Sequence, residues 1–192
     1  GVANLNTTTS GGVGLTYVWE YGGLTGASWT PVANSTPTGA TYTNPTGEDM
    51  TVTGITATGT HHYRLVLSSS GSGCGTVTGT GVIVTVNADP VISSNASPST
   101  ICQGGVANLN TTTSGGVGLT YVWEYGGLTG ASWTPVVDNT PVGSVYTNQA
   151  SEDMTVTGIT ATGTHHYRLV LSSSGSGCGT VTGTGVIVTV NA

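Results

Sequence analysis

The chain repeats itself with a period of 104 residues. Residues 1–88 align with residues 105–192 without a gap, and only nine aligned pairs differ, all between 33–47 and 137–151. A period of this length matches the size of a common domain and is long enough to bury its own core. We therefore expect two domains, residues 1–88 and residues 89–192, and we interpret their near-identity as a duplication within a longer array.

Apolar and polar residues alternate strictly in several short runs of each copy. In the second copy, apolar residues recur at every second position of "LTYVWEY" (119–125), "HHYRLVL" (165–171) and "GVIVTV" (185–190). Clusters of Gly, Pro, Asn and Ser separate the runs, and no stretch has a helical period. About seven short strands in about 100 residues predict an all-β sandwich. A lead-in strand at 90–102 precedes the second copy only, so the first domain is expected to lack its first strand within this chain.

Two aromatic residues and their spacing resemble an immunoglobulin-like domain. Trp123 lies in "LTYVWEY" and Tyr167 follows a glycine turn in "ATGTHHYRL"; Trp19 and Tyr63 are their equivalents in the first copy. In that family the Trp of strand C packs in the core and the Tyr marks the corner before strand F. The order of "CQG", "LTYVWEY", "SWTPV", "YRLVL", a Gly-flanked Cys and "VIVTVNA" is similar to the tandem immunoglobulin-like repeats of large secreted bacterial surface proteins, including gliding-type adhesins.

The cysteines depart from that family's pattern. Antibody-type domains carry a cysteine two residues after the corner Tyr, where this chain has Leu169. We predict instead a bridge between Cys102 and Cys178, worth about 4 kcal/mol for a loop this long and consistent with an oxidising, extracellular location. By the same alignment, the partner of Cys74 would lie before Gly1, outside this chain. The alternative is that Gly1 is a true end, that a neighbouring chain's strand fills the gap, and that Cys74 is free or links two chains.

Charge is scarce, which excludes several kinds of partner. Charged residues make up 5% of the chain, Arg64 and Arg168 are the only Lys or Arg residues, and the net charge is −6. Without cations the surface cannot hold phosphates, so nucleic acid is not an expected partner. No apolar run reaches the roughly 18 residues that a membrane span needs. The absence of Lys leaves strand edges without their usual protection, so we expect other copies of the chain as partners.

No pattern indicates catalysis, a cofactor or a metal. Adjacent residues on a strand face opposite sides, so neither "HH" pair (61–62 and 165–166) is expected to chelate one ion. The "ED" pairs at 48–49 and 152–153, with Asp89 at the junction, supply too few oxygens for calcium. No nucleophile elbow, phosphate loop or zinc spacing occurs in the sequence.

Two surface features remain as candidate contacts. Trp29 and Trp133 lie in "GASWTP" with Tyr21 and Tyr125 nearby, and such aromatic residues can stack on a sugar ring. The interpretation that we favour is that each Trp covers a sheet edge. The second feature is the variable region, 33–47 and 137–151, which is either drift on an exposed edge or a contact surface. Its candidate residues are Ala33, Asn34, Ser35, Thr38, Val137, Asp138, Asn139 and Val142.

These observations predict a secreted structural protein. We expect a repeat of an extracellular stalk, fibre or filament at a bacterial cell surface, self-associating or adhesive. The alternative is an array of carbohydrate-binding modules that recognises surface glycans through the exposed Trp and Tyr residues.

Overall fold

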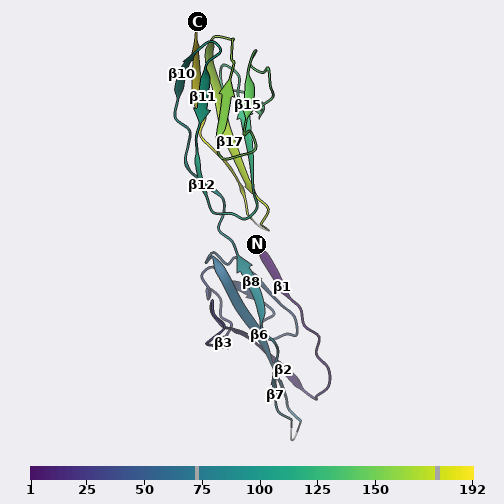
Figure 1. Cartoon of the computed structure of the whole chain (residues 1–192). Coiled ribbons are helices and arrows are strands. Elements are labelled where there is room, and N and C mark those ends of the chain that lie inside the picture. The colour runs from purple at the N-terminus through teal and green to yellow at the C-terminus, as the bar shows by residue number, and fades with distance from the viewer. Residues whose placement is uncertain (72–73, 176–177) are drawn as a thin grey trace. The chain divides into compact units, whose positions relative to one another are not determined.

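The computed structural model describes residues 1–71, 74–175 and 178–192. Within these ranges the structure consists of β-strands and connecting loops. No helix in this part of the chain is long and apolar enough to cross a membrane. The chain divides into unit 1, Gly1–Asn87, and unit 2, Ala88–Ala192 (Figure 1). This division lies one residue from the boundary expected from the repeat.

Unit 2 is a sandwich of antiparallel sheets with one parallel pair. The larger sheet has the strand order β10-β19-β17-β13-β14, and β18 also pairs with β17. Facing it are the sheet β11-β16-β15 and the pair β12-β9. The bounds are β9 Val91–Ser94, β10 Ser99–Cys102, β11 Val106–Leu109, β12 Thr112–Ser114, β13 Leu119–Tyr125, β14 Thr134–Pro135, β15 Val145–Thr147, β16 Met154–Thr157, β17 Gly163–Ser173, β18 Thr180–Thr182 and β19 Val186–Asn191.

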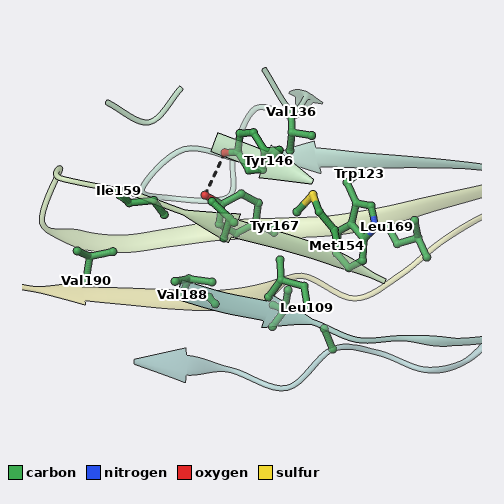
Figure 2. Packing of buried hydrophobic residues seen from close by; sticks show 14 residues of the cluster. Leu109, Trp123, Val136, Tyr146, Met154, Ile159, Tyr167, Leu169, Val188 and Val190 are labelled. Carbon is green, nitrogen blue, oxygen red and sulfur yellow. Dashed lines mark hydrogen bonds between the residues drawn. The ribbon is translucent and has the colours of Figure 1, made fainter. Parts of the chain in front are cut away.

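The core of unit 2 lies between the two layers, as the alternation predicts. Trp123 of β13 is directly opposite Leu169 of β17, and both are buried. Figure 2 shows them packed with Met154 and Leu109, which come from the facing layer. The predicted all-β sandwich is confirmed, because each alternating run turns its apolar side into this space.

Tyr167 lies inside a strand and not at its start, which corrects the position expected for a corner tyrosine. β17 begins four residues earlier, at Gly163. The Tyr167 side chain is fully buried, and its hydroxyl lies 3.2 Å from the hydroxyl of Tyr146 (Figure 2). Burial raises the pKa of Tyr167, and the neighbouring Tyr146 raises it further. Tyr63 and Tyr42 form the same pair in unit 1.

The lead-in segment forms two strands where the sequence predicted one. β9 pairs antiparallel with β12 in one layer, whereas β10 pairs parallel with β19 in the other. The chain crosses between layers at residues 95–98, where the buried Ala96 packs in the core. Pro98 cannot donate a ladder hydrogen bond, which favours a break at this point.

Unit 1 has the same arrangement without the lead-in strands. Its sheets are β3-β2-β6-β7, with β8 also paired to β6, and β1-β5-β4. Among the described residues of unit 1, nothing pairs with β8 on its second side, and residues 8–10, the equivalent of β12, are not a strand. The bounds are β1 Val2–Leu5, β2 Leu15–Tyr21, β3 Thr30–Pro31, β4 Thr41–Thr43, β5 Met50–Thr53, β6 Gly59–Ser69, β7 Thr76–Thr78 and β8 Val82–Val86.

Candidate functional site

The structure does not form the predicted bridge between Cys102 and Cys178. Among the described residues all three cysteines are unpaired. Cys102 ends β10 opposite Asn191, beside the start of β17, whereas Cys178 lies in the hairpin beyond the end of β17, with its Sγ 4.0 Å from the Ala88 carbonyl oxygen. β17 has 11 residues, so the two cysteines are separated by roughly 30 Å, far beyond the reach of a disulfide.

This correction removes the reason for giving Cys74 an in-domain partner. Cys74 is the equivalent of Cys178 and is exposed. The expected bridge rested on the presence of only two cysteines, Cys102 and Cys178, in one period of the sequence. Strand alternation does not say which strand ends meet, and that is what decides a disulfide.

Trp29 lies over the outer face of the larger sheet in unit 1 and contacts a charged pair. The Arg64 guanidinium carbon is 4.3 Å from the centre of the Trp29 ring, and Arg64 Nε donates to Glu20 at 2.7 Å. Gly22 has no side chain here, and a Cβ at that position would lie 2.9 Å from the ring. Trp133, Arg168 and Glu124 repeat this arrangement in unit 2, with 4.4 Å between guanidinium and ring.

Because the ring is half-buried and contacts its own arginine, the cluster stabilises the sheet from outside. The expected position for the Trp was over a sheet edge, whereas the ring lies over Arg64 of the inner strand β6. Sequence analysis placed the Trp on the surface but missed its arginine partner. The available signal was the register: Glu20 and Arg64 are directly opposite each other on β2 and β6.

His61 is a core residue, and the two histidines of each pair have different environments. His61 is buried, its Nε2 donates to the Ala57 carbonyl at 2.8 Å, and its Nδ1 lies 2.9 Å from the Tyr21 hydroxyl. With Nε2 as the donor, neutral His61 accepts from Tyr21 through Nδ1. His62 lies on the opposite side of the strand, beside Gly26. Tyr21 is therefore occupied within the fold, as is its equivalent Tyr125 with His165.

The acidic pairs bind a backbone loop. The Asp49 carboxylate accepts from the Thr7 amide at 2.8 Å, and the Glu48 carboxylate accepts from both the amide and the hydroxyl of Thr9. In unit 2, Asp153 accepts from the Thr111 amide and Glu152 from the Thr113 amide. No group of three or more His, Cys, Asp or Glu residues in the described ranges is placed to hold a metal ion.

The variable region consists of a mostly exposed loop followed by a short strand, β4 in unit 1 and β15 in unit 2, and its backbone is held in the same way in both units. Asn34 Oδ1 accepts from the Tyr42 amide at 2.9 Å, and Asp138 Oδ1 accepts from the Tyr146 amide at the same distance. Most substitutions around this anchor change outward side chains, but Ser144, which replaces Ala40, is buried, and its hydroxyl has no hydrogen-bond partner among the described residues. In unit 2 the exposed fraction is 63% for Val137 and 61% for Val142, where unit 1 has Ala33 and Thr38.

Comparison with known proteins finds similarity in structure only. No protein-family model matches the chain, and no curated protein matches its sequence. Among solved structures, the I-band fragment I67–I69 of titin aligns with 99% of this chain at a TM-score of 0.59 and 13% identity. The extracellular domains 3–5 of Drosophila OTK align with all of it at 0.54 and 12%. The fold is immunoglobulin-like. The chain spans 59% and 56% of those two solved chains.

The chain is therefore a tandem pair of all-β units, and unit 2 has the immunoglobulin-like features that the sequence indicated. β13, with Trp123, and β17, with Tyr167, are neighbours in its larger sheet and are equivalent to strands C and F. β9 and β10 divide the first strand between the two layers. At 12–13% identity, the similarity establishes the fold and assigns no partner or ligand.

Proposed function

We propose that this chain is a structural repeat module of an extracellular stalk, fibre or filament of a bacterial cell-surface protein. Tandem immunoglobulin-like units that differ at nine aligned positions are the expected product of lengthening an array by duplication. A spacer needs a stable fold and no reactive site. The bacterial surface location rests on the similarity of the motif order to secreted surface repeats, and it is part of the proposal.

The observation that carries the proposal is the parallel pairing of β10, the second strand of unit 2, with its last strand, β19. Residues 99–102 of β10 pair with residues 188–191 of β19, and the two strands run in the same direction. In parallel strands the interstrand bonds are evenly spaced. Tension applied through both ends of the unit would pull these strands in opposite directions and load the four residue pairs together. Such an arrangement resists extension, as a stalk requires.

The variable loop supports an adhesive role for the array. Loops on a rigid scaffold can change their side chains without cost to the core. Here the anchoring amide contact of Asn34 or Asp138 is retained, while Thr38 is replaced by the exposed Val142. Repeats would then present different surfaces from one framework.

Single-molecule extension of the full chain tests the load-bearing role. Unit 2 has the β10–β19 pair and unit 1 does not, so each molecule contains its own control. We expect two unfolding events, with the larger force for unit 2. A unit 2 event at a force no higher than that of unit 1 would exclude the proposed role for β10.

Sedimentation tests self-association separately. The chain has no Lys, and β8 has an open edge among the described strands of unit 1, so we expect species larger than a monomer as concentration rises. A Thr85→Lys substitution places a charge on β8 and should reduce association. A chain that stays monomeric at high concentration would remove association from the proposal.

A further inference from the structure

The two cysteines of unit 2 lie at opposite ends of the unit, and Cys102 is held at the end where β19 finishes. Cys102 is opposite Asn191 in the parallel pair, and the amide of the next residue, Gln103, donates to the Asn191 carbonyl at 2.9 Å. Neighbouring strands are about 4.8 Å apart, so the backbone of Cys102 lies beside the last residues of the unit. The Cys102 side chain is exposed there.

The first residue of unit 2 is held beside the other cysteine, Cys178. The Ala88 carbonyl oxygen accepts from the Gly116 amide at 2.9 Å and lies 4.0 Å from Cys178 Sγ. The next residue, Asp89, packs closely on Gly115, because a Cβ at that glycine would lie 2.1 Å from the Asp89 carbonyl oxygen. All of these residues belong to unit 2. The position of Ala88 beside the hairpin cysteine is therefore a property of the unit itself.

The sequence repeat makes Ala88 and Ala192 equivalent positions. In an array, a repeat that continues from Ala192 would place its own hairpin cysteine beside Ala192, as unit 2 places Cys178 beside Ala88. Cys102 is opposite Asn191, whose Cα is only about 3.8 Å from the Cα of Ala192. The two thiols would thus meet at the same two residues of backbone, whereas roughly 30 Å separates the cysteines within one unit.

We propose that consecutive repeats are joined by a disulfide from Cys102 of one repeat to the equivalent of Cys178 in the repeat that follows. The inference rests on the array in the proposed function, and it names the covalent link between the members of that array. It differs from a bridge within one unit, which the length of β17 prevents. Each repeat would use both of its cysteines, Cys102 towards the following repeat and Cys178 towards the preceding one.

The bond forms by oxidation of two thiols with a small disulfide such as oxidised glutathione. One cysteine thiolate attacks the small disulfide, which gives a mixed disulfide and releases one small thiol. The second cysteine thiolate attacks the protein sulfur of the mixed disulfide and releases the other small thiol. Two protein thiols are oxidised and one small disulfide is reduced to two thiols, which take up the two protons. Oxidants of this class occur in the compartments where disulfides persist.

The bridge would limit how far an array extends under tension. Without it, an unfolded repeat contributes its whole period of 104 residues, about 350 Å of extended chain. With it, the shortest covalent path follows residues 178–192, continues through the lead-in of the next repeat, and crosses the disulfide to the repeat after that. This path uses about 14 residues per repeat, or about 50 Å. Residues between Cys102 and Cys178 would carry no load.

The full chain lengthened by one repeat tests the proposal. A further copy of residues 89–192 is joined after Ala192, and Ser replaces every cysteine except Cys102 and the hairpin cysteine of the added copy. The control is the full chain with Cys74→Ser, whose only cysteines are Cys102 and Cys178. In dilute solution with oxidised glutathione, we expect the lengthened monomer to lose both thiols and two hydrogen atoms of mass. The control should form no internal bridge.

Moving the thiol along β10 tests the position of Cys102. In the lengthened chain, Cys102→Ser is combined with Thr100→Cys, which places the thiol on the same side of the strand, opposite Thr189. The thiol then lies about 7 Å further from the end of the unit. We expect this variant to close the bridge roughly tenfold or more slowly, because disulfide geometry tolerates little separation.

Single-molecule extension measures the bridge independently of thiol chemistry. Closing it should shorten the fully unfolded lengthened chain by roughly 180 residues, or about 600 Å, and reduction should restore the full length. Circular dichroism verifies that the variants retain the β-sheet fold.

Three results would overturn the inference: a lengthened chain that keeps its thiols or bridges only between molecules, equal closure by the control, or equal closure rates with the thiol at position 100. The load-bearing proposal is tested on the reduced chain by the unfolding forces of units 1 and 2. The two proposals therefore fail independently.

Discussion

Units 1 and 2 have nearly the same sequence but different exposure. Val82 and Val186 are aligned, as are Leu67 and Leu171, yet the unit 2 residue of each pair is buried and the unit 1 residue is not. None of the nine substitutions lies in these strands. The difference arises from residues 90–102, which cover unit 2 alone. A residue's burial is therefore a property of the complete repeat and cannot be assigned from its own strand.

The central tryptophans should show the largest effect and should act on one unit at a time. Trp19 and Trp123 are each 1% exposed. Trp123→Ala should destabilise unit 2 by about 3–5 kcal/mol, because it removes a large buried side chain and leaves a cavity. Calorimetry should show the unit 2 transition lowered and that of unit 1 unchanged. Trp19→Ala is the matched variant for unit 1, and simultaneous shifts of both transitions would contradict two independent cores.

Alkaline pH should destabilise both units, because the tyrosine pair is common to them. Burial raises the pKa of Tyr63 and Tyr167 in the folded state. The unfolded chain releases these protons near pH 10 while the folded chain retains them, so stability is present below pH 10 and is lost as pH rises further. The loss is about 1.4 kcal/mol per pH unit for each such tyrosine.

Tyr167→Phe should reduce this alkaline slope in unit 2 alone. Urea unfolding between neutral pH and about pH 11 measures it, and Tyr63→Phe is the equivalent variant in unit 1. A slope in unit 2 that is unaffected by Tyr167→Phe would show that Tyr167 is not its source.

The lead-in strand should account for the stability difference between the units. Ile92→Ser removes an anchor that packs against the unit 2 core and should cost about 1–2 kcal/mol. Val91→Ser is the control, because Val91 is on the same strand and is 47% exposed. In thermal unfolding, Ile92→Ser should lower the unit 2 transition temperature towards that of unit 1, whereas Val91→Ser should leave it unchanged. Equal shifts for both variants would contradict the anchoring role of Ile92.

The ion pair beneath the surface tryptophan should have the smallest effect, and an equal one in both units. Arg64 and Arg168 make the same contacts in their own units. Replacement by Ala should cost about 1 kcal/mol or less, since exposed ion pairs and cation–π contacts contribute little. Urea unfolding measures both losses of stability. A clearly different loss in unit 1 and unit 2 would show that the lead-in segment also influences the outer face of the sheet.

The sequence predicted the features that depend on strand periodicity. Alternation around Trp123 and Leu169 indicated which side is buried, and the 104-residue repeat indicated two domains. The sequence did not predict which ends of the strands lie together. A bridge between Cys102 and Cys178 was expected, but the 11-residue strand β17 separates these two cysteines.

Hydrogen exchange of the aligned strands β8 and β19 tests most directly whether residues 90–102 complete the repeat. In unit 2, β19 lies between β17 and β10, whereas among the described residues of unit 1 β8 pairs with β6 alone. Amide exchange resolved by NMR should show the outward-facing amides of residues 84–86 exchanging rapidly and those of residues 188–190, which β10 covers, protected. Equal protection in both strands would contradict the account, because identical sequences would then behave alike with and without the lead-in segment.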